Sequence, residues 1–90
     1  MPTVTAKILK VGGITQGQYG FYLYVFFKLE DGSSARSCLN PKNGNYQRWR
    51  PYLDRAKKGE EVWLKNLIMT GTRLINADSF FQEVKPTNAG

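Results

Sequence analysis

The chain has 90 residues and a formal net charge of +6, and 41% of its residues are hydrophobic. A chain of this length forms one domain with a small core, and the composition is that of a globular protein rather than a disordered one. It contains no histidine and a single cysteine, Cys38. This excludes imidazole catalysis, internal disulfides and metal centres built from histidine or several cysteines, so we expect no metal and no cofactor.

The basic side chains are concentrated between Arg36 and Lys58, where Asp54 is the only acidic residue. A field of one sign attracts polyanions such as nucleic acids, although a solubilising surface charge would give the same composition. No apolar stretch is long enough to cross a membrane, and the N-terminus does not resemble a secretion signal. We expect a soluble, cytoplasmic protein with no membrane partner, in the host-cell cytoplasm if the chain is viral.

The N-terminal half predicts three strands. Residues 4–8 alternate between apolar and polar, and residues 21–28 are almost all aromatic or β-favouring apolar residues. The glycine-rich segment 12–20 between them predicts a loop or a strongly bent strand end. Asp31 and Gly32 form a strong hairpin signal, so a third strand is expected at residues 33–39. The turn-forming residues 40–45 end it.

The C-terminal half predicts one short helix followed by two strands. Pro51 suits the first helical position and Gly59 a helix end, so we expect the helix at residues 51–58, after an irregular segment 46–50. Residues 61–67 alternate again, and residues 70–72 predict a turn. The last strand is expected at residues 73–84, with a break near residue 78 as an alternative. The domain then covers residues 1–84, followed by a flexible C-terminal tail at residues 85–90.

This order of elements is that of an all-β OB-fold, a five-stranded Greek-key barrel, here with one short helix between strands 3 and 4. An SH3-like barrel is the nearest competitor, but it would not place a helix there. With its aromatic second strand and the sequence KGEEVWL at residues 58–64, the chain resembles small OB-fold single-stranded DNA-binding proteins of phages and mobile elements over residues 3–84. The resemblance implies DNA binding in replication, recombination or DNA transfer.

The second predicted strand carries bulky side chains on both faces. Its odd-numbered positions from 21 to 29 are apolar and suit the barrel interior, whereas its even-numbered positions are Tyr22, Tyr24, Phe26 and Lys28. Aromatic rings spaced along one strand can stack on unpaired bases of any sequence, at ~1–3 kcal/mol per base. The alternative is that both faces are buried, under the helix or in a subunit interface. Buried tyrosines would each need a hydrogen-bond partner, so we favour an exposed platform.

The turn after this strand decides which residue lies opposite Phe26. A two-residue loop would pair Phe27 with Arg36 and place the arginine inside the barrel. A three-residue loop with a left-handed Gly32 pairs Phe27 with Ala35 and Phe26 with Arg36. An unpaired buried charge costs far more than a turn preference, so we predict the three-residue loop. Arg36 then lies beside the aromatic row, where it can bind phosphate or stack on a base.

Further candidates for nucleic-acid binding surround this platform. They are basic or aromatic residues of the first and fourth strands and of the segment around the helix start: Lys7, Lys10, Trp63, Lys65, Arg48, Trp49 and Arg50. Trp63 and Lys65 alternate with apolar residues, and they either widen the platform or lie outside it. Trp49 is equally suited to plug the end of the barrel. The segment 12–20 is either a mobile loop that folds over a bound strand or a plain long turn.

No pattern indicates catalysis, because the acidic residues are scattered and no glycine-rich phosphate loop precedes a helix. We predict a non-enzymatic, sequence-tolerant single-stranded DNA-binding protein. One alternative is an OB-fold interaction module that uses the same aromatic face as a subunit interface, and another is cold-shock-like RNA binding. Small chains often gain core by pairing, so we also consider a homodimer.

Overall fold

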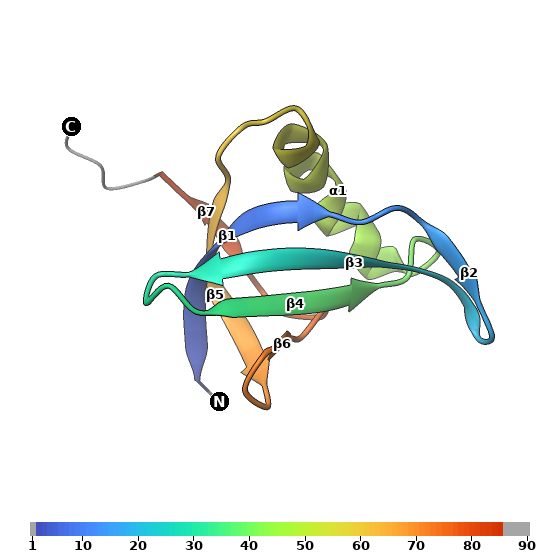
Figure 1. Ribbon diagram of the computed structural model, residues 1–90, viewed down its shortest axis with the longest axis horizontal. Helices are drawn as coiled ribbons and strands as arrows, with labels where there is room; N and C mark the ends of the chain where they lie inside the picture. Colours follow the sequence, from blue (N-terminus) through green and yellow to red (C-terminus); the bar gives the residue numbers. More distant parts are fainter. Residues whose placement is uncertain (1, 86–90) are drawn as a thin grey trace.

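Seven strands and one helix make up residues 2–85, the part of the chain that the computed structural model describes (Figure 1). In chain order the elements are β1 (Thr3–Val11), β2 (Thr15–Gly17), β3 (Gly20–Leu29), β4 (Ser34–Leu39), α1 (Gly44–Lys57), β5 (Trp63–Thr70), β6 (Leu74–Ile75) and β7 (Gln82–Val84). Within this part of the chain, no helix combines the length and the apolar character needed to cross a membrane.

Five of the strands close into a barrel. β1 lies antiparallel between β3 and β5, β3 is antiparallel to β4, and β5 is antiparallel to β6. A short parallel contact between β4 and β6, at Arg36 and Leu74, completes the ring. β7 adds to β5, and β2 adds to the start of β3. The expected barrel is therefore confirmed, and so is a helix between its third and fourth strands.

The helix closes one end of the barrel with two buried side chains, Trp49 and Leu53. The Trp49 ring packs edge-on against Phe27 of β3, with 5.8 Å between ring centroids. Its indole Nε1 donates a hydrogen bond of 3.0 Å to the carbonyl of Ala77, so the polar end of the buried ring is satisfied. Trp49 is therefore the plug at the end of the barrel, which is the second of the two roles considered for it.

The helix is longer than predicted, because it begins at Gly44 instead of Pro51. The Asn43 side chain caps it by accepting a hydrogen bond of 3.0 Å from the backbone N–H of Asn45. Pro51 then lies inside the helix, where it has no N–H to donate to the carbonyl of Gln47. Burial of Trp49 on the turn before Pro51 outweighs this local penalty.

Two other predicted elements differ in the structure. Residues 12–20 are not a plain loop, because β2 pairs with the start of β3 through Gly17 and Gly20 and forms a hairpin that projects away from the barrel (Figure 1). Phe21 lies in this hairpin and is exposed, so its predicted place in the barrel interior is wrong. The last predicted strand is broken, as the alternative allowed, into β6 and β7.

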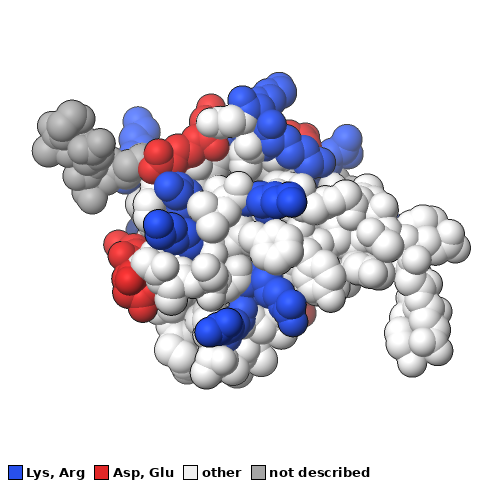
Figure 2. Space-filling view, in the orientation of Figure 1, with Lys and Arg blue, Asp and Glu red and all other residues white. Residues whose placement is uncertain are grey.

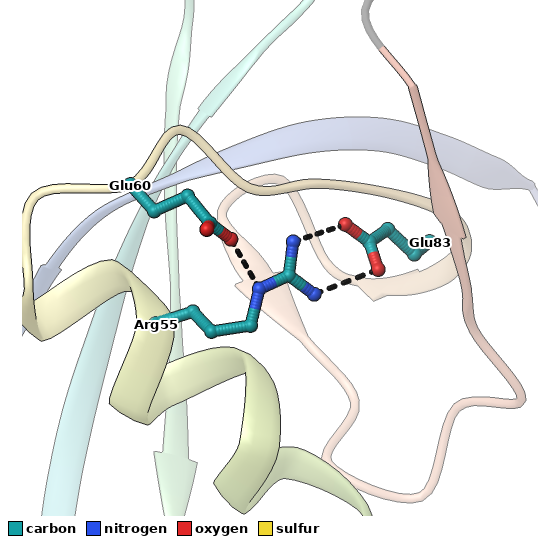
Figure 3. Close-up of polar contacts among 3 residues, drawn as sticks. All are labelled: Arg55, Glu60 and Glu83. Carbon is teal, nitrogen blue, oxygen red and sulfur yellow. Dashed lines mark hydrogen bonds and ion pairs between the residues drawn. The ribbon is translucent and has the colours of Figure 1, made fainter.

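The C-terminal strand β7 is held against the helix by Arg55 (Figure 3). The guanidinium group donates two hydrogen bonds to the Glu83 carboxylate, at 2.8 and 2.5 Å, and a third to Glu60. These bonds lower the pKa of the Glu83 carboxyl below its ordinary value. Of the predicted C-terminal tail only Lys85 is described, and residues 86–90 lie outside the described part of the chain.

Candidate nucleic-acid interface

A row of three aromatic rings runs along the outer face of β3. Tyr22 and Tyr24 meet edge to face with 5.6 Å between ring centroids, and Tyr24 lies 6.3 Å from Phe26. The tyrosines are half-buried and Phe26 is 39% exposed, whereas Leu23, Val25 and Phe27 between them are buried in the core. The predicted division of β3 into an apolar inner face and an aromatic outer face therefore holds along the barrel itself.

The β3–β4 register places Arg36 beside this row. Phe26 lies opposite Arg36, Tyr24 opposite Cys38 and Phe27 opposite Ala35, which confirms the predicted three-residue loop. Gly32 has the left-handed φ of 91° that this loop requires. The Arg36 guanidinium carbon lies over the Tyr24 ring, 5.5 Å from its centroid.

A β-bulge brings Lys10 to the other side of Phe26. The β1–β3 register slips between Ile8 and Lys10, which leaves Leu9 without a partner and 52% exposed. Before the bulge the even-numbered residues of β1 face the core, and after it Lys10 lies opposite Phe26 and is exposed. Phe26 is therefore flanked by one basic residue on each neighbouring strand.

A second row of basic residues crosses the sheet beside the first. Lys28 lies opposite Lys7 of β1, and Lys7 in turn lies opposite Trp63 of β5. The Lys7 ammonium is over the Trp63 ring, 5.8 Å from its centroid. Of the two positions considered for Trp63, within a wider platform or outside it, this geometry favours the first, with Lys7 as the link between β3 and β5.

Two hollows adjoin the aromatic row, both on the β4 side. The first, of about 490 Å³, lies between β4 and the β5–β6 turn and is lined by Phe26, Arg36, Arg73 and the hydroxyl-bearing residues Ser34, Thr70 and Thr72, among others. The backbone N–H of Arg36 donates to the Arg73 carbonyl at 2.9 Å, which fixes the two arginines side by side. The hollow is thus lined by an aromatic residue, two arginines and hydroxyl-bearing residues, the residue types that contact the base and phosphate of a nucleotide.

The second hollow, of about 350 Å³, lies at the other end of the row. One side of this hollow is formed by the β2–β3 hairpin, including Tyr19 and Tyr22. The opposite side is formed by Tyr24, Cys38 and the end of β4. Just outside it, the Lys42 ammonium lies 4.9 Å from the centroid of the exposed Phe21 ring. The aromatic row therefore continues from one hollow to the other.

The cations of this face have no acidic partners in the part of the chain that the structure describes. The ion pairs among residues 2–85 are those of Arg50 with Asp54 and of Arg55 with Glu60 and Glu83, all on or beside α1. Figure 2 shows Lys and Arg side chains spread over the β1–β3–β4 face, with acidic side chains at its margins. The face is thus positively charged and its cations are free to bind an external anion.

Four of the predicted site residues lie away from this face. Trp49 is fully buried, so it offers no ring to a ligand, and its assignment as a binding residue is wrong. Arg48 lies on α1 and stacks on Phe80 and Phe81 of the C-terminal segment, while Arg50 pairs with Asp54 at 3.9 Å. Lys65 of β5 lies opposite Gln82 of β7 rather than in either cross-strand row.

Three features of this surface were not predicted from the sequence: Arg73, the threonines of the first hollow, and Tyr19. Arg73 joins the site only through the parallel contact of β4 with β6, which brings together segments far apart in the chain. Nothing in the local sequence pattern around Arg73 indicates that contact. Tyr19 had a weak signal, because it lies in the glycine-rich segment considered as a flap over a bound strand.

Comparisons with protein-family models, with curated proteins and with solved structures give no match for this chain.

Proposed function

We propose that this protein is an OB-fold protein that binds single-stranded DNA without sequence preference, through the outer face of β3 and its neighbours on β1 and β4. The order of strands around the barrel, β1-β3-β4-β6-β5, and the place of α1 between β4 and β5 support the OB-fold assignment. We further propose that the strands follow a Greek-key path and that the chain is related to the small single-stranded DNA-binding proteins that it resembles. Its proposed role is a non-enzymatic one in replication, recombination or DNA transfer.

The observation that carries the proposal is the row Lys10–Phe26–Arg36 across three strands. A ring between two cations suits a nucleotide, because the base stacks on the ring while a phosphate meets a cation at its edge. Tyr24 and Tyr22 repeat the aromatic part of this arrangement along β3. Repetition of a stacking site at intervals matches a polymer of bases better than a single small ligand.

The arrangement favours single strands over duplex. In a duplex the faces of the bases are stacked on one another, so aromatic rings on a protein surface reach them only after unpairing. Here the rings lie on an open sheet face and the two hollows are on its surface. The projecting β2–β3 ribbon has the shape that can enter a major groove, but it carries no charged residue, so it lacks the cations that would hold it against a duplex.

The test is a fluorescence-anisotropy titration of labelled oligo(dT) beside a DNA duplex of the same length, repeated at several salt concentrations. We expect oligo(dT) to bind more tightly at every salt concentration, and both affinities to fall as salt rises. Equal affinity for duplex at moderate salt would contradict the proposal, because charge alone would then explain binding. Parallel titrations with oligo(dA) and oligo(U) test sequence tolerance and the RNA alternative.

A further inference from the structure

The β2–β3 hairpin is an arm that projects from the barrel with no third strand beside it in the described residues. Within the described residues, β2 pairs only with the start of β3, from Thr15 opposite Tyr22 to Gly17 opposite Gly20. An isolated two-stranded ribbon is marginally stable in water, and a third strand or an apolar layer is normally needed. This arm exposes apolar side chains instead, with Ile14 59% and Tyr19 94% exposed.

The outer edge of the arm lacks the features that keep strand edges from pairing. Proteins protect exposed edges with charged residues, proline or a covering element. The chain has no charged residue between Lys10 and Lys28, and β2 contains only Thr15, Gln16 and Gly17. Figure 2 shows the projecting hairpin free of basic and acidic side chains. Another free edge, that of β7, differs because it carries Glu83, which is bound to Arg55.

We propose that the free edge of β2 pairs with the same edge of a second copy of this chain. The charge distribution selects this partner, because each copy carries +6 and two copies repel wherever their basic faces meet. The uncharged arm is where two copies can approach without that repulsion. A phosphate-bearing partner would gain no cation there. Antiparallel pairing of β2 with its copy about a two-fold axis uses the same patch on both chains.

This arrangement joins two arms into a sheet of four strands, β3-β2-β2-β3. Of the three residues of β2, Gly17 lines the second hollow, whereas no residue of β2 lines the first, so pairing at the outer edge of Thr15 and Gln16 leaves the first hollow and Phe26 accessible in both copies. The paired protein would then present two platforms to one strand of nucleic acid, which raises the effective concentration of the second platform once the first has bound. The self-association itself requires no nucleic acid, so it stands or falls independently of the proposed function.

Sedimentation analysis of the full chain without nucleic acid, over a series of protein concentrations, tests this proposal. We expect a concentration-dependent species of twice the 10.2 kDa mass. Gln16→Lys places two like charges at the pairing edge, and we expect the dimer dissociation constant to rise ~10-fold or more. Gln47→Lys is the matched control, since Gln47 is exposed on α1 and far from the arm in sequence, and its dimer should equal that of the wild type.

Thermal melts establish that each variant is folded, and Thr15→Lys provides a second substitution at the same edge. Loss of the dimer in both edge variants, with the control unchanged, supports pairing at β2. A wild-type protein that stays monomeric up to its solubility limit overturns the proposal. A dimer that survives both edge substitutions overturns it as well, because pairing must then occur elsewhere.

Discussion

The position of Phe26 between two cations depends on single residues. Leu9 is left out of the β1–β3 pairing, and this bulge exchanges the inward-facing and outward-facing positions of β1. As a result the Lys10 side chain lies outside the barrel. Gly32 sets the loop that places Arg36 on the other side, and its φ of 91° is one that a residue with a Cβ rarely adopts. The arrangement of ring and cations on this face therefore depends on two backbone features, the bulge beside Phe26 and the turn that follows β3.

The pair of Lys7 and Lys28 predicts a conflict between stability and binding. Like charges directly opposite each other on neighbouring strands are destabilising. We expect Lys28→Gln to raise the free energy of unfolding by ~0.2–1 kcal/mol, measured by urea denaturation. The same change should weaken oligo(dT) binding and make the salt dependence shallower by about 0.7 per lost phosphate contact. Lys57→Gln on α1 is the control, and a Lys28 variant that binds like the wild type would contradict the prediction.

At the scale of elements, the helix and the barrel strands are stabilised in different ways. Strands β3 and β4 could be predicted from the way their side chains alternate between two faces. Burial of Leu23, Val25 and Phe27 in the barrel core confirms that alternation for β3. The helix contains an internal proline and relies on tertiary burial of Trp49 and Leu53. Local sequence rules therefore describe the strands well and the helix poorly.

Replacement of Pro51 tests the extent of the helix. Alanine supplies the N–H that the carbonyl of Gln47 lacks, and removes a residue that costs ~3 kcal/mol inside a helix. The more flexible unfolded chain offsets ~0.4–1 kcal/mol of this gain. We therefore expect Pro51→Ala to stabilise the protein by roughly 2 kcal/mol in urea denaturation. A neutral or destabilising effect would indicate that the helix begins at Pro51 after all.

The sequence was sufficient to predict what depends on neighbouring residues. The register of β3 against β4 followed from the cost of burying Arg36, and the outward face of β3 followed from its alternation. The bulge at Leu9 and the contact of β4 with β6 could not be predicted, because both depend on how distant strands meet in the closed barrel. For the same reason Arg73 was missed, and Trp49, which the sequence left open as plug or ligand contact, proved to be the plug.

At the scale of the whole molecule, one cluster of charges ties the C-terminal strand to the helix. Arg55 links α1 to β7 through Glu83 and to the segment before β5 through Glu60. Trp49 of α1 and Phe81, which precedes β7, also pack together, with 4.1 Å between ring centroids. Three acidic residues, Asp54, Glu60 and Glu83, are thus paired on or beside the helix, and the cations of the proposed binding face have no ion-pair partner among the described residues.

The lowered pKa of Glu83 predicts a pH dependence of stability. In the folded state Arg55 binds the Glu83 carboxylate in its charged form. The stabilisation that this pair contributes to the fold is therefore fully present above the ordinary pKa of 4.5 and is lost as the pH falls through the lowered pKa. We expect Glu83→Gln to melt at a lower temperature than the wild type at neutral pH, with the difference closing in acid. Glu30→Gln in the β3–β4 turn is the control. A constant difference between the Glu83 variant and the wild type at all pH values would contradict this account.

The central claim is that the rings of β3 bind bases, and replacement of one ring tests it most directly. Phe26→Ala and the matched Phe80→Ala, whose ring is 80% exposed and lies in neither hollow beside the aromatic row, are titrated with oligo(dT) at several salt concentrations beside thermal melts. We predict that Phe26→Ala loses ~1–3 kcal/mol of affinity with an unchanged salt slope, because stacking releases no counterions. Phe80→Ala should bind like the wild type. A folded Phe26→Ala variant with wild-type affinity would contradict the account.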